Sequence, residues 1–192
     1  PDQGEILLEG EHVLKMKNKK LSQIRRDKIG FIFQDYNLLD NMTLQDNIAL
    51  PLSLNGVSPA KTLKKVQEKA LVFGLESHLQ KYPYQLSGGQ KQRAASARAL
   101  ITEPRILFAD EPSGALDSRA SRGLLCCLKA ANEEGSATIL MVTHDVYTAS
   151  YARQVYFLKD GQIQCRLNHR GDRKEFYDEI MQMLASMGGE QE

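Results

Sequence analysis

LSGGQKQR at residues 86–93, followed by ILFADEP at residues 106–112, is the stretch that decides the fold of this chain. The first run places a serine and two glycines at the start of a helical pattern, and the second is an apolar strand that ends in two acids. A strand of this kind delivers its last residues to the carboxyl edge of a parallel sheet, where α/β folds bind ligands. We therefore expect an α/β fold with a ligand site at that edge.

The start of the helix at residues 87–101 has the features of an anion site. A helix N-terminus exposes unpaired N–H groups and about half a positive charge, and glycines let a phosphate approach the backbone. Ser-Gly-Gly alone is equally compatible with an ordinary helix start, but the full run is far more specific. The candidate anion-binding residues are Ser87, Gly88, Gly89 and Gln90.

Two adjacent acids end the strand at residues 105–109 and suit phosphoanhydride hydrolysis. Asp110 would face Mg2+, which neutralises developing charge, and Glu111 would face the attacking water. Taken alone, the pattern is also that of a surface strand terminus. Its position downstream of residues 86–93 favours the catalytic interpretation.

Composition narrows the class of protein. The 192 residues are 42% hydrophobic and 26% charged, as in a globular domain with one subdomain. The formal net charge is +1, and this near-neutral charge does not indicate nucleic acid as a partner. Three cysteines, two of them adjacent, do not make a secreted disulfide framework, so we expect a reducing compartment. A basic cluster at residues 15–28 is interpreted as a solvated face, with an anionic partner as the alternative.

Periodicity predicts a sheet interrupted by helices. We expect short strands within 5–14, a helix at 21–27 and a strand at 28–33, then helices at 43–50, 59–73 and 87–101, interrupted by Pro51, Gly74 and Pro83. Strands at 105–109 and 138–142 flank a helix at 118–132, and their apolar runs predict burial on both faces. A hairpin at 155–166 and a helix at 173–186 follow. The expected divisions are a core that contains the sheet (1–34 and 105–168), a helical subdomain (35–104) and a C-terminal helix (169–192).

A phosphate-cradling G-x-x-x-x-G-K-[ST] loop is absent from these residues. The nearest match, residues 55–62, has the Lys-Thr pair, but Asn55 and Ala60 stand where glycines are needed and Pro59 removes an N–H donor. We interpret Ser58 and Pro59 instead as the cap and first position of a helix.

The ordered motifs resemble the nucleotide-binding domain of ABC ATPases over essentially the whole chain. LSGGQKQR is similar to the family signature, ILFADEP to the Walker B strand with its catalytic glutamate, and residues 113–117 (SGALD) to the D-loop. Gln34, after a predicted strand, matches the Q-loop glutamine, and His144 matches the switch histidine. Taken singly, Gln34 and His144 are equally a polar strand end and a histidine beside the sheet; the set in order is specific.

The resemblance implies a fold, cofactors and roles. The fold would be a P-loop NTPase-like parallel sheet with a helical insert, with the N-terminal P-loop part missing from these residues, and the cofactors would be ATP and Mg2+. Two domains would dimerise head to tail, with the signature residues of one capping ATP on the phosphate loop of the other. Glu111, His144 and Gln34 would be catalytic, Asp110 and Gln34 would face Mg2+, and Asp117 would cross the dimer interface.

Residues 30–52 and 172–177 resemble more narrowly the macrolide, lipoprotein and, above all, bacitracin-type peptide exporters. This implies a membrane-spanning permease as partner and a location at the cytoplasmic face of the plasma membrane. The alternatives are a soluble ABC ATPase of DNA repair or translation, and a non-catalytic scaffold. Without the phosphate loop, we expect this polypeptide alone to bind ATP weakly and not to hydrolyse it.

Overall fold

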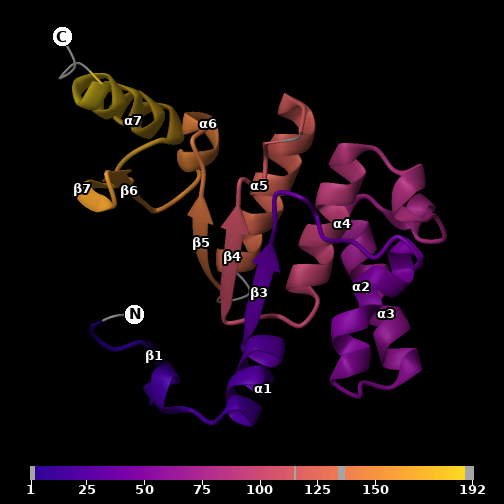
Figure 1. Ribbon diagram of the computed structural model, residues 1–192. Helices are drawn as coiled ribbons and strands as arrows, with labels where there is room; N and C mark the ends of the chain where they lie inside the picture. Colours follow the sequence, from indigo (N-terminus) through magenta and orange to yellow (C-terminus); the bar gives the residue numbers. More distant parts are fainter. Residues whose placement is uncertain (1–2, 115, 134–136, 189–192) are drawn as a thin grey trace.

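A parallel sheet of three strands forms the centre of the computed structural model, which describes residues 3–114, 116–133 and 137–188. The strands are β3 (Ile29–Ile32), β4 (Ile106–Asp110) and β5 (Thr138–Val142), in the order β3-β4-β5 (Figure 1). All three run parallel, and Phe31 pairs in register with Phe108, which pairs with Leu140. The carboxyl ends of the strands therefore share one edge, as the sequence predicts.

One face of this sheet is packed and the other is open. Helix α5 (Ser118–Glu133) covers one face, where Ile32, Leu107 and Leu124 are at most 1% exposed (Figure 1). On the opposite face Leu140 is 55% exposed, and Phe31 stacks on Phe108 with ring centroids 5.2 Å apart. The prediction that both faces are buried is wrong for the described residues. An apolar strand sequence indicates that burial would stabilise both faces, but it does not indicate which elements cover them.

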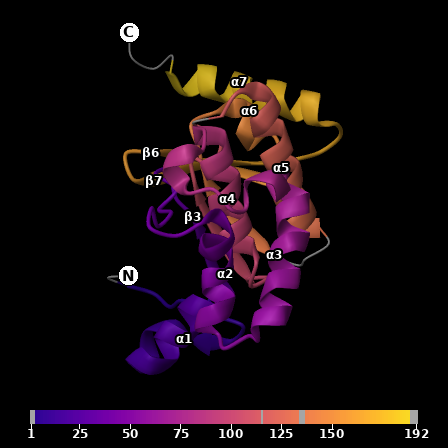
Figure 2. The same ribbon diagram turned by 90° about the vertical axis from the view of Figure 1, so that its right-hand side faces the viewer.

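Three helices pack together beside the sheet (Figure 2). They are α2 (Leu44–Leu54), capped by Thr43, α3 (Pro59–Phe73), which ends at Gly74 with φ 61°, and α4 (Gly88–Leu100). Pro51, expected to end α2, lies inside it. The helix continues because Leu52, beyond the proline, is buried in the core, and this burial offsets the one missing backbone hydrogen bond.

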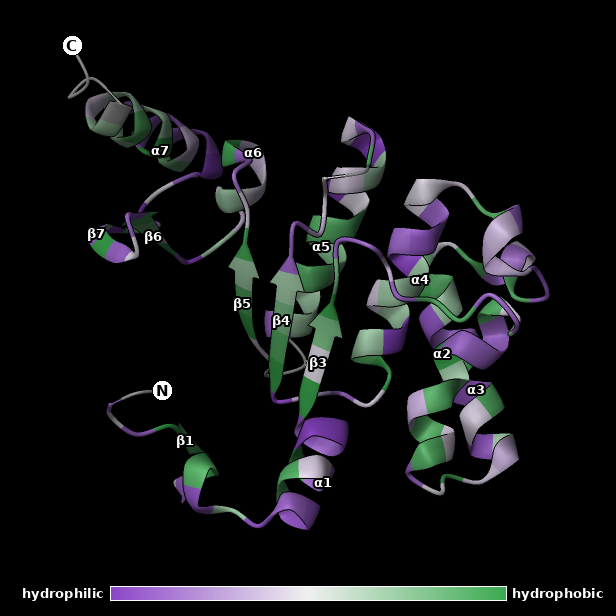
Figure 3. Ribbon diagram, viewed as in Figure 1, coloured by the Kyte–Doolittle hydropathy of each residue, from purple (hydrophilic) through white to green (hydrophobic). Residues whose placement is uncertain are grey.

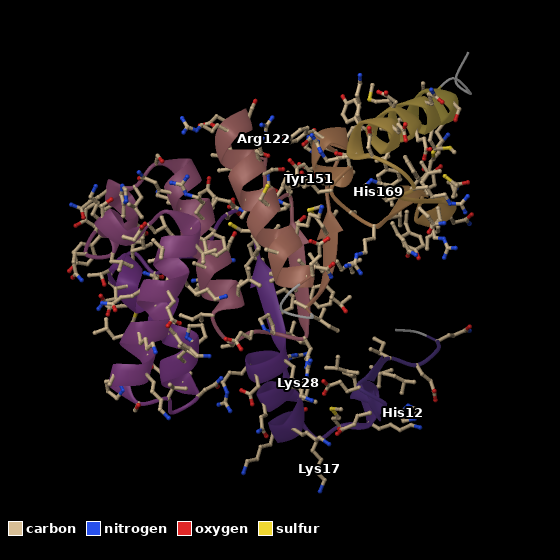
Figure 4. All side chains as sticks on the ribbon, turned by 180° about the vertical axis from the view of Figure 1, so that it is seen from behind. His12, Lys17, Lys28, Arg122, Tyr151 and His169 are labelled. Carbon is tan, nitrogen blue, oxygen red and sulfur yellow. The ribbon has the colours of Figure 1, made fainter. Side chains whose placement is uncertain are left out.

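The N-terminal segment contains less strand than expected. Residues 5–14 form only the two-residue strands β1 (Leu7–Leu8) and β2 (Glu11–His12), followed by a turn of 3-10 helix, while α1 runs from Asn18 to Lys28 and is longer than predicted. Helix α1 is mostly hydrophilic, in contrast to the apolar strands β3 and β5 (Figure 3). Its end carries Lys28, which pairs with Glu9 (Figure 4). The pairing of such basic residues with acids favours the solvated-face interpretation.

The C-terminal part is a hairpin and a helix. Strands β6 (Gln154–Lys159) and β7 (Gln162–Asn168) pair antiparallel around Asp160 and Gly161, as predicted, and α7 (Arg173–Gly188) buries Phe176 and Ile180 against them. A short helix that the sequence analysis did not predict, α6 (Val146–Ala149), connects the sheet to this part. Among the described residues, every helix is too short or too polar to span a bilayer.

Candidate functional site

Glu111 is placed by the ends of two strands. It follows β4 directly, and its backbone N–H donates to the carbonyl of Val142 at the end of β5, at 2.9 Å. Its φ of 43° lies in the left-handed region, which costs about 1 kcal/mol or more for a residue with a side chain. This backbone turns the carboxylate toward the residues that follow β5.

The Glu111 carboxylate binds the loop after β5. Oε1 accepts from the His144 backbone N–H at 2.8 Å and lies 2.7 Å from His144 Nδ1, while Oε2 accepts from the Thr143 hydroxyl at 3.1 Å. The Glu111 side chain is 17% exposed and that of His144 is 87% exposed. The structure thus joins two predicted site residues, with the imidazole reaching into solvent from a nearly buried carboxylate.

A second set of hydrogen bonds, which the sequence analysis did not predict, connects the loop that carries His144 to α6. Asp145 caps α6 by accepting from the backbone of Tyr147 and Thr148. The Thr148 hydroxyl lies 2.5 Å from Asp145 Oδ2 and 2.6 Å from the hydroxyl of Ser113, and both Thr148 and Ser113 are buried. Asp145 was the sequence signal that could have predicted the start of α6, because aspartate is a preferred N-cap residue. Through Thr148 and Asp145, these bonds connect Ser113 to the loop that carries His144, which we call the histidine loop.

Asp110 and Gln34 lie at the same edge of the sheet. Asp110 ends β4, Gln34 follows β3 beyond Phe33, and both side chains are exposed. A carboxylate and an amide oxygen are hard donors of the kind that Mg2+ takes together with substrate phosphates and water. The described residues contain no group of three or more His, Cys, Asp or Glu able to hold a metal by themselves. The donor set fits an ion shared with a phosphate ligand.

Ser87 is the N-cap of α4, as predicted. Its hydroxyl accepts from the Gln90 backbone N–H at 3.3 Å, and Gln90 Oε1 accepts from the Ser87 backbone N–H at 2.9 Å, which makes a complete capping box. A side chain at Gly89 would put a Cβ 3.3 Å from Leu116 Cδ2, so the segment before α5 packs closely on this helix start. Gly88 is exposed at the helix start. The arrangement leaves a glycine backbone accessible to an anion.

Asp117 acts as a helix cap in this structure. Its Oδ1 accepts from the backbone N–H of Arg119 at 2.9 Å and of Ala120 at 2.8 Å, at the start of α5. Ala115, in the same predicted loop, lies outside the described residues. Within the described residues, no hydrogen bond or ion pair joins Asp117 or residues 87–90 to Glu111 or His144. The predicted site is therefore two separate clusters in one chain.

Arg98, also missed from the sequence, connects α4 to the loop after Gln34. Its guanidinium donates to the carbonyl of Asn37 at 2.5 Å and of Tyr36 at 2.9 Å, two residues with φ of 49° and 61°. Burial lowers the pKa of Arg98, and the two carbonyls compensate for the lost hydration. Asn47, fully buried, holds the next turn by bonding both backbone groups of Leu39.

The three remaining histidines are partly exposed, and two of them contact residues of other elements. His12 lies near Glu5 in the N-terminal segment. His78 instead lies 2.9 Å from the Gln90 side-chain amide, and His169 stacks on Phe176 with ring centroids 4.6 Å apart and a buried Nε2. The fold brings these partners to His78 and His169 from other elements.

The comparisons with known proteins give a uniform result. The family model described as "ABC transporter" matches residues 1–114. The bacitracin export ATP-binding protein BceA of Halalkalibacterium halodurans is 48% identical over 190 residues, which cover 98% of this chain and 75% of that protein. The macrolide export ATP-binding/permease protein MacB of Wolinella succinogenes is 41% identical over 166 residues, 86% of this chain and 26% of that larger protein.

A solved structure agrees with these relatives. The dimeric post-hydrolysis state of the ATP-binding cassette MJ0796, bound to ADP and Pi, superposes with a TM-score of 0.82 at 38% identity. The superposition covers 90% of this chain and 76% of that chain. MJ0796 comes from Methanocaldococcus jannaschii.

Proposed function

This chain belongs to the ABC transporter family, and we propose that it is the ATP-binding and ATP-hydrolysing part of an exporter whose membrane-spanning subunits are separate. The observation that carries the proposal is the Glu111 carboxylate, held nearly buried against His144 at the carboxyl edge of the sheet. A carboxylate and an imidazole in contact at a ligand-binding edge suit proton transfer and orientation of a water molecule.

The proposed catalytic roles follow from position. Glu111 orients or deprotonates the attacking water, His144 contacts the γ-phosphate, and Gln34 and Asp110 hold the metal ion. Mg2+, when bound, supplies positive charge to the phosphates in the transition state. Gln34 extends from β3 into the loop held by Arg98, so this loop connects the metal side of the site to the signature helix α4.

The signature residues serve a second subunit. We assign Ser87, Gly88, Gly89 and Gln90 to the γ-phosphate of an ATP that lies on the phosphate loop of a partner nucleotide-binding domain, and Asp117 to the interface between the two. The capped start of α4 with its accessible glycines supports this role, and the dimeric cassette MJ0796 provides the precedent for pairing. The proposed divisions remain an ATPase core at 1–34 and 105–168, a helical subdomain at 35–104 and a C-terminal helix at 169–192.

The proposed cargo is an antimicrobial peptide or a similar amphiphile. The bacitracin and macrolide export functions of the relatives support it, and the helical residues 44–100 offer the surface that would receive the permease. A protein that drives a permease in this way works at the cytoplasmic face of the plasma membrane. Soluble repair or translation ATPases are the second candidate, and no observation on this chain favours them.

The 192-residue polypeptide by itself is predicted not to turn over ATP, because these residues contain no G-x-x-x-x-G-K-[ST] loop to hold the β- and γ-phosphates. The measurement is phosphate release by the purified chain, with Glu111→Gln as the background control. Phosphate release that Glu111→Gln abolishes would contradict this prediction.

The role of the signature residues is tested with a relative that carries its own phosphate loop. The relative's signature serine is replaced, so that only this chain can cap the nucleotide. ATP is expected to cause the two proteins to associate in sedimentation. Association that is equal with and without ATP would argue against the proposed function.

A further inference from the structure

The side chain of Gln90 is held at both of its amide atoms. Its Oε1 accepts from the Ser87 backbone N–H at 2.9 Å, and its Nε2 lies 2.9 Å from Nε2 of His78. Because the backbone N–H of Ser87 can only donate, the amide orientation is fixed and the group that faces His78 is the NH2 donor. His78 Nε2 is therefore an acceptor and carries no proton.

The other imidazole nitrogen completes the same chain of bonds. His78 Nδ1 lies 3.0 Å from the hydroxyl of Ser77, so the tautomer that accepts at Nε2 donates to Ser77 Oγ from Nδ1. His78 belongs to a 3-10 turn, Glu76–His78, that follows α3. The turn is thus connected through one neutral imidazole to the capping box that begins α4.

We propose that His78 is a positioning residue for the signature segment, residues 86–90: neutral His78 holds Gln90 in the capping box, and protonation of His78 releases it. A protonated imidazole presents N–H groups on both sides, and one of them would face the Gln90 NH2, so two donors would meet where a hydrogen bond now exists. The functional consequence rests on the proposed role of these residues as the nucleotide cap. Because Gln90 is one of the proposed cap residues, the loss of its fixed orientation at low pH is expected to weaken its contact with the nucleotide.

The charges around His78 set the direction of its pH response. Lys81, in the following turn, and Arg93, on α4, oppose a positive imidazole, while Glu76 in its own turn favours one. Burial, the largest effect, and these two cations lower the pKa of His78 below its ordinary value. The bond to Gln90 is therefore fully present above the ordinary histidine pKa, and it is lost as the pH falls through the lower value of the folded state.

The test is a nuclear magnetic resonance titration of the 192-residue chain without nucleotide, from about pH 8 to about pH 5. The signals of the Gln90 side-chain NH2 and the Ser87 backbone N–H are expected to move together with His78 protonation. The protection factor of the Ser87 N–H, which compares its exchange with that of an unprotected amide at the same pH, should fall roughly fivefold, the effect expected from loss of a cap. His12→Gln, at an exposed histidine of the N-terminal segment, is the matched control and should leave the titration unchanged.

Two variants separate positioning from general stability. His78→Gln offers a carbonyl oxygen near the place of Nε2 and does not titrate, so it should keep the bond across the whole pH range. His78→Leu removes the acceptor and should show the low-pH signals at every pH. Gln90 signals that ignore His78 protonation, or His78→Gln signals that match those of His78→Leu, would overturn the proposal.

The functional consequence is measured separately, by ATP-dependent association with the loop-bearing relative at both ends of the pH range. Association that weakens at low pH in the wild type but not in His78→Gln supports both inferences. A normal His78 titration without ATP-dependent association at any pH supports the positioning role and contradicts the proposed function instead.

Discussion

Arg98 shows how one side chain can determine the shape of a functional loop. The carbonyls of Tyr36 and Asn37 point to one guanidinium, and both residues have φ in the left-handed region, which a bulky side chain such as that of Tyr36 disfavours. A planar fork with several donors can serve both carbonyls at once, whereas an ammonium is a point charge. The loop after Gln34 therefore depends on α4 for its conformation.

Replacing Arg98 by lysine is predicted to lower the free energy of unfolding by about 1–2 kcal/mol, since one of the two partly buried or exposed carbonyls loses a charge-assisted hydrogen bond. Urea unfolding measures the change. Arg25→Lys, at an exposed position on α1, is the control and should have little effect. Equal stabilities for the two variants would show that the Arg98 bonds are not needed to hold the loop.

The contact between strand β3 and helix α4 depends on a glycine. A Cβ at Gly30 would lie 2.7 Å from the carbonyl oxygen of Ala99 and 2.9 Å from Leu107 Cδ1, closer than atoms can approach. The carbonyl belongs to the backbone of the segment that ends α4, so it cannot move away cheaply. The close approach brings the signature helix against the sheet that carries Glu111.

Gly30→Ala is predicted to destabilise the fold by about 1–3 kcal/mol through overpacking. Gly123→Ala, on α5, meets open space and should instead stabilise by about 0.5–1 kcal/mol, because alanine favours the helix. Thermal unfolding of the pair checks the opposite signs. A stable Gly30→Ala chain would contradict the observed packing of β3 on α4.

Helices α6 and α7 are joined by an aromatic cluster. The guanidinium of Arg173 lies 4.7 Å from the ring centre of Tyr151 and 5.0 Å from that of Tyr147, and the two phenol oxygens are 3.0 Å apart. Arg122 of α5 donates to the Tyr147 oxygen (Figure 4). Because α6 begins at the Asp145 cap next to His144, this cluster supports the histidine loop from the C-terminal side.

The two phenols are predicted to ionise in separate steps at high pH. Burial raises the pKa of Tyr151 to about 12, while hydrogen bonds from Tyr151 and Arg122 lower the pKa of Tyr147. A raised pKa means that the contribution of neutral Tyr151 to stability is present below the unfolded-state value and is lost as the pH rises through about 12. Ultraviolet absorbance of the phenolate measures both steps. A late step that persists in Tyr151→Phe would contradict the assignment.

At the scale of the whole molecule, the sequence predicted the local elements better than the contacts between distant residues. The cap at Ser87, the strand ending in Asp110 and Glu111, and the hairpin at Asp160 follow from local patterns, and the structure confirms them. Arg98 and His78 were not found, because their partners lie far along the chain or in turns without a periodic signal.

The extent of α2 and the open face of the sheet were also not predictable. Whether Pro51 ends a helix depends on the burial of Leu52, and whether Phe31 is covered depends on other elements of the fold. Local propensity contains neither kind of information. What the sequence does carry is the order of the motifs, and in the structure the residues of these motifs lie at the start of α4 and at the edge of the sheet.

In the proposed function, the start of α4 in this chain caps an ATP held by another subunit. Ser87→Asp tests it sharply, because aspartate is as good a helix cap as serine but places a negative charge where the phosphate would bind. Ser58→Asp puts the same charge at the N-cap of α3 and is the matched control. Both variants should keep the fold by circular dichroism.

The deciding measurement is sedimentation of this chain with a loop-bearing relative, with and without ATP. We expect ATP-dependent association for the wild type and for Ser58→Asp, and a loss of at least about tenfold in affinity for Ser87→Asp, which corresponds to about 1.4 kcal/mol. Ser87→Asp that associates as tightly as the wild type would contradict the claim.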